Sequence, residues 1–256
     1  MRTTTRNKVV KIVSSASSVK RVKNPTEKSN GFLWAILALL VVVIAVVAFI
    51  VIQGRGAQAD KFADRERESI SFGGAVTDNA IQLKAANAKS DAKKIDLYED
   101  YSCSHCAELG KATDKPMKEA IEKGEIVVNL RFLNFLDRGN EDGSSSKGGA
   151  AALAIANAGE WEAYWNYRTL LMEEQNSIYG QWSNDDFANA AKNVGASDEV
   201  VQKIREGAEK QHFLDAAKAN TEKLEKDSGK VSSPRVFIDG KEVTENINTW
   251  VTQATS

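Results

Sequence analysis

The longest apolar run of the chain lies near its N-terminus. Residues 31–52 contain no charged side chain and consist mostly of Leu, Ile, Val, Ala and Phe. A helix of this length extends over about 33 Å, and the hydrocarbon core of a bilayer is about 30 Å thick. The pattern therefore predicts one transmembrane helix.

The middle of the chain alternates between strand-like and helix-like patterns. Residues 81–83 form a short apolar run typical of an edge strand, and residues 94–98 alternate polar and apolar side chains as a strand does. Helical spacing follows over residues 103–124, with a break or kink expected at Pro116. Residues 125–132 read as a buried strand. Because a strand, a helix and a strand follow in order, we expect a parallel pair.

The second half of the chain is predicted to be mostly helical. Residues 140–149 are polar and glycine-rich, which indicates a flexible connection. Their lysine precedes the glycine, and this is the wrong order for a phosphate loop. Helical periodicity then continues from residue 150 to about residue 226. One face of this region is aromatic and typical of a buried helix core, with Trp161, Tyr164, Trp165 and Leu170.

The C-terminal residues predict a hairpin and a last helix. Two short apolar runs within residues 235–243 flank Asp239-Gly240, a strong turn signal. Residues 247–251 have the apolar content of a short helix.

Charge is divided unevenly along the chain. Residues 1–30, rich in Ser, Thr and Lys, carry eight Lys and Arg against one acid, which predicts a disordered tail on the cytoplasmic side. Residues 53–74 alternate in charge sign and predict a juxtamembrane linker. Residues 75–256 are long enough for one domain with its own core. The prediction is thus a single-pass protein of the cell membrane with its main domain outside.

The apolar helix has an alternative interpretation as a cleaved signal peptide. Ala57-Gln58-Ala59 offers a small-x-small pattern with cleavage after Ala59. The basic region is long, however, and the apolar run exceeds the about 7 to 15 residues of a usual signal. An anchor is therefore favoured, and in both cases the main domain is exported. Nucleic acid is not an expected partner, because the basic residues are spread out without interleaved aromatics.

The only two cysteines, Cys103 and Cys106, belong to one Cys-Ser-His-Cys motif directly after a predicted strand. A disulfide closing so short a loop gains only roughly 2 kcal/mol in the loop-closure model. A zinc or iron–sulfur site needs about four ligands, and the chain adds only His105 and His212 to these thiols. Covalent haem would need histidine where Ala107 stands. Reversible dithiol–disulfide exchange remains, with no metal or cofactor, and His212 is given no role.

Two motifs lie far apart in the chain. Leu-Tyr-Glu-Asp-Tyr-Ser-Cys-Ser-His-Cys occupies residues 97–106, and Val-Ser-Ser-Pro-Arg-Val-Phe-Ile-Asp-Gly occupies residues 231–240. Their combination resembles the DsbA-like thiol-disulfide oxidoreductases, and more narrowly the membrane-anchored actinobacterial type. This resemblance implies an α/β fold, the thioredoxin fold with an inserted helical domain at about residues 144–228.

The resemblance also implies roles for single residues. Cys103 would be the exposed nucleophile and Cys106 the resolving thiol. Ser233 and Pro234 would form a cis peptide that faces the pair and binds the substrate chain.

Two positions depart from familiar members of these families. Ser104 stands where the best-known DsbA proteins have proline, which affects the redox potential. Leu97 stands where thioredoxins place a buried acid, so Glu99 becomes the candidate proton acceptor.

Cys103 needs a low pKa to react near neutral pH, and each pKa unit corresponds to about 1.4 kcal/mol. The dipole and free N–H groups of a helix N-terminus supply about one unit. We expect His105, as an imidazolium or N–H donor, to supply much of the rest. The nearby acids Glu99, Asp100 and Glu108 act in the opposite direction.

The predicted function is donation of the Cys103–Cys106 disulfide to reduced exported proteins. The resemblance implies reoxidation by a quinone-linked membrane partner that is DsbB-like or vitamin K epoxide reductase-like. One alternative is a disulfide reductase or isomerase, which a redox potential near about −270 mV would indicate. Another is a membrane-tethered chaperone or binding module with incidental thiols.

Overall fold

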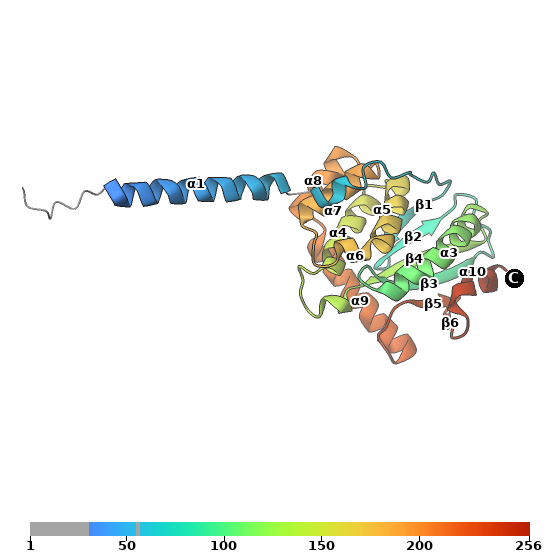
Figure 1. The fold of residues 1–256 in the computed structure, drawn as a ribbon. Helices are drawn as coiled ribbons and strands as arrows, with labels where there is room; N and C mark the ends of the chain where they lie inside the picture. Colours follow the sequence, from blue (N-terminus) through green and yellow to red (C-terminus); the bar gives the residue numbers. More distant parts are fainter. Residues whose placement is uncertain (1–30, 55–56) are drawn as a thin grey trace, which may run out of the picture. The chain divides into compact units, whose positions relative to one another are not determined.

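The computed structural model describes residues 31–54 and 57–256, so the predicted tail of residues 1–30 lies outside the described part. The described residues divide into two compact units, the first ending at residue 48 and the second covering residues 49–256. Helix α1 (Gly31–Gly54) opens the described part (Figure 1). Its mean hydropathy over Phe32–Ile50 is 3.3. This stretch is long and apolar enough to cross a membrane, a property that an anchor shares with a signal sequence.

The second unit contains one sheet and the remaining helices. Its strands are β1 (Gly73–Thr77), β2 (Ala80–Lys84), β3 (Lys93–Asp100), β4 (Ile126–Leu133), β5 (Arg235–Ile238) and β6 (Lys241–Glu242). Its helices are α2 (Ala57–Asp60), α3 (Ser104–Glu122), α4 (Ser144–Asn157), α5 (Trp161–Glu173), α6 (Gln175–Ile178), α7 (Asn184–Asn193), α8 (Asp198–Glu206), α9 (Lys210–Ser228) and α10 (Trp250–Thr255).

The strands follow the order β1-β2-β4-β3-β5-β6 across the sheet. β3 and β4 are parallel, as the strand–helix–strand pattern predicts, with Leu97 opposite Leu130. The other neighbouring pairs are antiparallel. Because β3 lies inside the sheet, the loop that follows it is held in place by β4 and β5 on either side.

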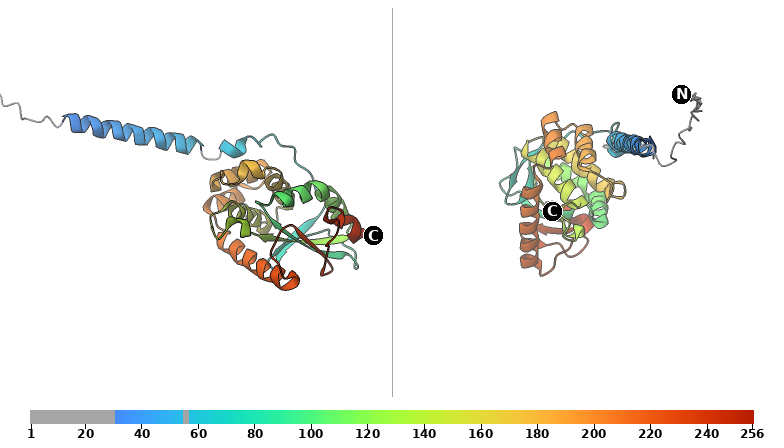
Figure 2. Two further views of the ribbon diagram at one scale, coloured as in Figure 1. Left: turned by 60° about the horizontal axis from the view of Figure 1, so that its bottom comes forward. Right: turned by 90° about the vertical axis from the view of Figure 1, so that its left-hand side faces the viewer.

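Helices cover both faces of the sheet (Figure 2). On one face, Leu97 of β3 belongs to the same core as Leu109 and Met117 of α3. On the other face, Tyr98 packs with Leu224 of α9. Alternate residues of β3 therefore enter two different cores, as the period of a strand requires.

The predicted edge strand at residues 81–83 is wrong in its position. β2 lies between β1 and β4, and β1 forms the edge instead. β1 begins with two glycines and has no apolar run, so its pattern is weak. The turn that joins the two strands has positive φ at both Asp78 (49°) and Asn79 (55°), the geometry of a tight hairpin without glycine.

The predicted flexible connection at residues 140–149 is also wrong beyond Gly143, because α4 already begins at Ser144. Gly148 and Gly149 of α4 serve close packing within the helix layer. A Cβ on Gly149 would lie 2.0 Å from Cε2 of Phe213, a residue of α9. Glycine at this position therefore allows α4 and α9 to approach, and helices α4 to α9 fill residues 144–228.

Other predicted elements are present. α3 continues through Pro116 without the expected break. Of the predicted aromatic face, Tyr164, Trp165 and Leu170 are buried, and Trp161 is half-buried against the same core. The hairpin of β5 and β6 turns at Asp239, where φ is 49°.

Part of the segment predicted as a linker packs on the folded domain. The ring of Phe62 lies 5.9 Å from that of Trp182, and the ring of Phe72 lies 5.6 Å from that of Trp165. Trp165 Nε1 also donates a hydrogen bond to Glu68 Oε2 at 2.9 Å. Residues 62–72 are therefore fixed to the domain by aromatic and polar contacts.

Candidate active site

The two cysteines lie where β3 passes into α3. Cys103 is the N-cap residue of α3 and has an extended backbone with φ −90° and ψ 110°. Its N–H donates to the Asp100 carbonyl at 2.9 Å, and its own carbonyl accepts from Cys106 N–H at 3.0 Å. These bonds form the turn that places both side chains at the helix N-terminus. Both thiols are free in this structure.

The two thiols differ in accessibility. Cys103 is 7% exposed, whereas Cys106 is 0% exposed. The prediction that Cys103 is exposed is therefore wrong, because the residue is buried beside the loop before β5. It is still the more accessible of the two cysteines, so an attacking sulfur reaches Cys103 before Cys106.

The pKa of Cys103 is lowered from 9.0 to about 5. The largest cause is a hydrogen bond from the Cys106 thiol, and burial opposes it. The Ser233 hydroxyl and the backbone N–H groups of Cys106 and His105 also favour the thiolate. The helix N-terminus thus contributes as the sequence suggests, and the second cysteine contributes more.

Cys106 shows the opposite behaviour. Burial raises its pKa well above the usual value, and the hydrogen bond to Cys103 acts in the same direction. The negative charge of Glu99 raises the pKa further. The reduced site therefore favours one thiolate at Cys103 and one thiol at Cys106.

The loop before β5 faces Cys103. The Ser233–Pro234 peptide bond is cis, as the resemblance implies. The Sγ atom of Cys103 lies 3.5 Å from the Ser233 carbonyl oxygen. The Ser233 hydroxyl is buried and makes no hydrogen bond within the described residues, so it is available to a thiolate. The structure thus brings the two sequence motifs together.

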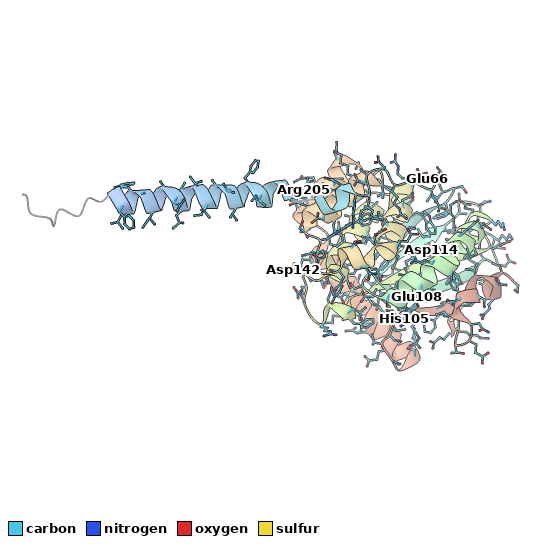
Figure 3. All side chains as sticks on the ribbon, in the orientation of Figure 1. Glu66, His105, Glu108, Asp114, Asp142 and Arg205 are labelled. Carbon is cyan, nitrogen blue, oxygen red and sulfur yellow. The ribbon has the colours of Figure 1, made fainter. Side chains whose placement is uncertain are left out.

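His105 has a different neighbour from the one expected. Its side chain is 76% exposed, and its Nδ1 lies 3.2 Å from Oε2 of Glu108 one turn further along α3 (Figure 3). Its backbone N–H contributes to the low pKa of Cys103. Ser104 is also exposed, at the first position of α3.

Glu99 is held by an arginine from the helical insertion. Arg168 Nη2 and Nε donate to the two oxygens of Glu99 at 2.5 and 3.0 Å, and both side chains are buried. Arg168 Nη1 also donates to Asp114 Oδ2 at 2.9 Å. Burial raises the pKa of Glu99, and Arg168 opposes this shift. Leu97, at the position where thioredoxins have an acid, is a core residue.

Sequence reasoning missed Arg168, although a signal was present. Tyr164, Arg168 and Leu171 share one face of α5 at helical spacing, and the aromatic neighbours mark that face as buried. A charged residue on such a face needs a partner of opposite charge. Glu99 and Asp114 supply it.

Asp100 ties the active-site loop to the start of α4. Its carboxylate accepts hydrogen bonds from the Ser145 hydroxyl at 2.5 Å and from the Ser102 N–H at 2.9 Å. Burial raises the pKa of Asp100 to about 6, and these bonds oppose the shift. A second contact comes from α6, where Gln175 Nε2 donates to the Cys103 carbonyl at 3.0 Å. No local sequence pattern identifies either contact.

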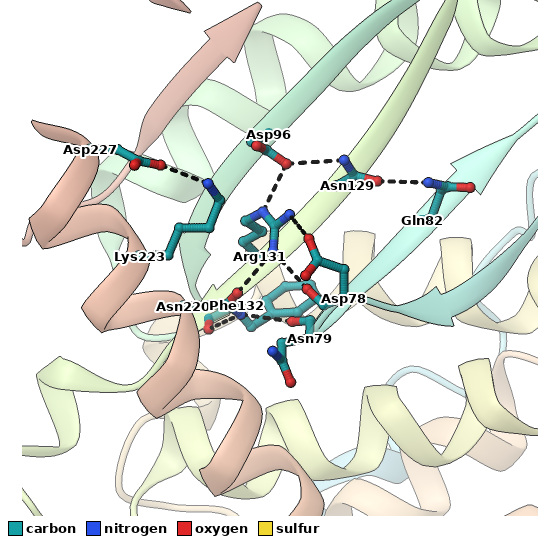
Figure 4. Close-up of polar contacts among 10 residues, drawn as sticks. All are labelled: Asp78, Asn79, Gln82, Asp96, Asn129, Arg131, Phe132, Asn220, Lys223 and Asp227. Atoms are coloured by element: carbon teal, nitrogen blue, oxygen red, sulfur yellow. Dashed lines mark hydrogen bonds and ion pairs between the residues drawn. The ribbon is translucent and has the colours of Figure 1, made fainter. Parts of the chain in front are cut away.

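A buried arginine fixes the edge of the domain away from the cysteines (Figure 4). Arg131 of β4 donates to Asp78 at 2.6 Å, to Asp96 at 2.8 Å and to Asn220 at 3.3 Å. These partners belong to the β1–β2 turn, β3 and α9. The network holds the last insertion helix on the sheet that carries the site.

Among the described residues, no group of three or more His, Cys, Asp and Glu side chains could hold a metal ion. His212 lies outside the site, with its Nδ1 2.9 Å from Glu209 Oε2. The chemistry of the site rests on the two sulfurs and the groups around them.

Comparisons with known proteins agree with this geometry. A family model described as thioredoxin matches residues 86–254. A solved structure of MdbA, a thiol-disulfide oxidoreductase from Corynebacterium diphtheriae, is 68% identical with a TM-score of 0.76, and the match covers 77% of this chain and 100% of that one. MdbA from Corynebacterium matruchotii is 47% identical with a TM-score of 0.74, covering 77% and 98% of the two chains.

More distant structures share the fold. DsbA from Mycobacterium tuberculosis in its reduced form is 15% identical with a TM-score of 0.54, and the match covers 69% of this chain and 98% of that one. A comparison with curated protein sequences gave no match.

Proposed function

The chain belongs to the DsbA-like thiol-disulfide oxidoreductases, and from this membership we propose that it oxidises exported proteins by donating a Cys103–Cys106 disulfide. One observation carries the direction: the pKa of Cys103 is lowered to about 5, whereas burial raises that of Cys106. A stabilised thiolate stabilises the reduced enzyme, and this makes the disulfide a better oxidant.

The reaction consists of two exchanges. A substrate thiolate attacks Cys103 Sγ, the Cys103–Cys106 bond breaks, and Cys106 leaves and takes a proton. A second substrate thiolate then attacks the substrate sulfur of the mixed disulfide, and Cys103 leaves as a thiolate. The substrate loses two electrons and two protons. The enzyme gains both electrons and one proton, and the other proton passes to solvent at a pH above about 5.

The reverse half of the cycle needs Cys106 to lose its proton. Glu99 is our candidate acceptor, since its negative charge acts on the Cys106 thiol. The ion pair with Arg168 supports this role, because it opposes the rise in the Glu99 pKa that burial causes.

Ser233 and Pro234 are proposed to bind the substrate chain. The Ser233 carbonyl faces Cys103 and lies just before β5, so an extended segment attached to Cys103 can run beside it as an added strand. Such backbone recognition is independent of side chains and suits many substrates.

Ser104 and His105 are proposed to tune the potential. Both are exposed at the first turn of α3, where charge and hydrogen bonding act on the Cys103 thiolate. The contact of the His105 ring with Glu108 limits its effect on the sulfur.

We place the enzyme at the cell membrane, with α1 as an anchor, the N-terminus in the cytoplasm and the catalytic domain outside. The basic residues before α1 support this orientation. Ala59, which precedes the candidate cleavage site, is buried and its carbonyl accepts a hydrogen bond from Asn193 at 2.9 Å, which favours retention.

Continued turnover requires an oxidant for the reduced pair. We propose a membrane protein with its own disulfide that passes electrons to a quinone, either DsbB-like or vitamin K epoxide reductase-like. An anchored catalytic domain would meet such a partner in the same membrane.

The test is oxidation of a reduced, unfolded protein with two cysteines by the oxidised enzyme. We expect one disulfide to form for each enzyme disulfide consumed, and none with Cys103→Ser. If the substrate thiols stay reduced with the wild-type enzyme, a reductase or isomerase is favoured. If Cys103→Ser still oxidises the substrate, the Cys-Ser-His-Cys motif is not responsible for the activity.

A further inference from the structure

One aromatic side chain of the second unit is unusually accessible. Among the described residues outside α1, Tyr179 is the only large apolar side chain that is more than half exposed, at 56%. A single exposed aromatic is common on protein surfaces and carries no meaning by itself. Tyr179, however, belongs to a segment that is hydrogen-bonded to the active-site loop.

Two hydrogen bonds connect Tyr179 with the nucleophile. The Tyr179 N–H donates to the Gln175 carbonyl at 2.8 Å, and Gln175 Nε2 donates to the Cys103 carbonyl at 3.0 Å. Gln175 is buried, so this connection is shielded from water. The segment that presents Tyr179 is therefore attached to the N-cap of α3.

A second connection comes from α4. The Gly180 N–H donates to the Ser144 hydroxyl at 2.9 Å, and the hydroxyl of the next residue, Ser145, lies 2.8 Å from the Ser102 hydroxyl. Ser102 directly precedes Cys103. The first two residues after α6 are thus connected to the active-site loop by two separate routes, through Gln175 and through the start of α4.

Tyr179 also borders two spaces in the surface. It lines a small gap together with Ser102 and Gln175. It further lines a hollow of about 290 Å³ together with Asp137, Ser144 and Lys147. The aromatic ring therefore stands between the active-site loop and a polar hollow that contains charges of both signs.

The mixed disulfide determines what reaches this surface. While a substrate sulfur is bonded to Cys103, the residues next to that cysteine must lie on the surface around it. Reduced, unfolded polypeptides expose the apolar side chains that folded proteins bury. A large apolar side chain near the reacting cysteine can lie against the Tyr179 ring, with polar neighbours in the hollow.

We propose that Tyr179 is a specificity-determining residue that binds a large apolar side chain of the substrate near its reacting cysteine. This inference rests on the proposed function. It adds side-chain selectivity, on the insertion side of Cys103, to the backbone recognition assigned to Ser233.

The experiment compares two reduced peptides with two cysteines each, identical except that leucine and tryptophan flank the first cysteine in one and serines in the other. Covering a few tens of Å² of apolar surface is worth about 3- to 10-fold in rate, and we expect the wild type to oxidise the apolar peptide faster by that factor. Tyr179→Ala should bring the ratio close to one. Tyr179→Phe should retain it, and so should Gln181→Ala at an exposed neighbour.

Several results would overturn the inference. A wild-type ratio near one excludes the subsite while leaving the oxidase function intact, and a ratio unchanged in Tyr179→Ala removes this residue from it. A Tyr179→Ala enzyme that keeps the ratio and loses reoxidation in membranes would assign Tyr179 to the membrane partner instead. If the wild type oxidises neither peptide, the proposed function itself fails.

Discussion

Gln175 Nε2 donates a hydrogen bond to the backbone carbonyl of Cys103 at 3.0 Å, and both residues are buried. Gln175 belongs to the helical insertion, and Cys103 is the N-cap residue of α3, outside that insertion. The insertion is therefore part of the active site and contributes to the position of the nucleophile.

This contact predicts that shortening the Gln175 side chain lowers the stability of the protein. Gln175→Ala removes a buried donor, and a neutral hydrogen bond contributes about 0.5 to 1.5 kcal/mol to the free energy of unfolding. We expect a decrease of this size in urea denaturation of the reduced enzyme. Gln181→Ala, at an exposed position six residues further along the chain, serves as the control and should leave the midpoint in place. Equal midpoints for all three proteins would mean that the contact contributes nothing.

The Arg168 pair predicts strong non-additivity. Arg168→Met leaves Glu99 buried and uncompensated, and breaking such a pair costs about 3 to 5 kcal/mol. The double variant Glu99→Leu and Arg168→Met removes both charges, so we expect it to be more stable than Arg168→Met alone. Chemical denaturation of the wild type, Arg168→Met, Glu99→Leu and the double variant measures the coupling. Additive losses would contradict the pair as the structure describes it.

Asp100 predicts a pH dependence of stability. Its pKa is raised from 3.8 to about 6, so the folded protein binds a proton that the unfolded chain has released between about pH 4 and pH 6. Stability should therefore fall as the pH rises through this window, by about 2 to 3 kcal/mol for this group. Asp100→Asn cannot titrate, and the fall attributable to this group should be missing from its unfolding curves. The same pH profile in both proteins would show that Asp100 is not responsible.

The low pKa of Cys103 should respond differently to two substitutions of Cys106. The largest cause of the low pKa is the hydrogen bond from Cys106. Cys106→Ser keeps a donor at this position and Cys106→Ala does not. Titration of the Cys103 thiolate by its ultraviolet absorbance should give a higher pKa in Cys106→Ala than in Cys106→Ser. If the order is reversed, the second cysteine does not stabilise the thiolate.

The sequence predicts the parts of the site that depend on local pattern. The strand, the Cys-Ser-His-Cys motif and the helix follow directly from residues 94–124, and the parallel pair of β3 and β4 follows from their order. The resemblance adds the Ser233–Pro234 loop, which the structure places against Cys103.

Other parts depend on contacts between distant segments and have no local pattern. The edge strand β1 is too short and too rich in glycine to be recognised. Glu99 lies 69 residues from Arg168, and Cys103 lies 72 residues from Gln175, so only the fold brings each pair together. The direction of the His105 side chain depends on its contact with Glu108, which spacing alone does not determine.

The redox potential of the Cys103–Cys106 pair tests the central claim most directly. Equilibration of the enzyme with glutathione buffers measures this potential. A thiolate stabilised at Cys103 favours the reduced form, so we predict a value between about −120 mV, typical of DsbA, and about −200 mV. A value at or below the about −270 mV of thioredoxin would contradict the account, because such a pair reduces the disulfides of exported proteins.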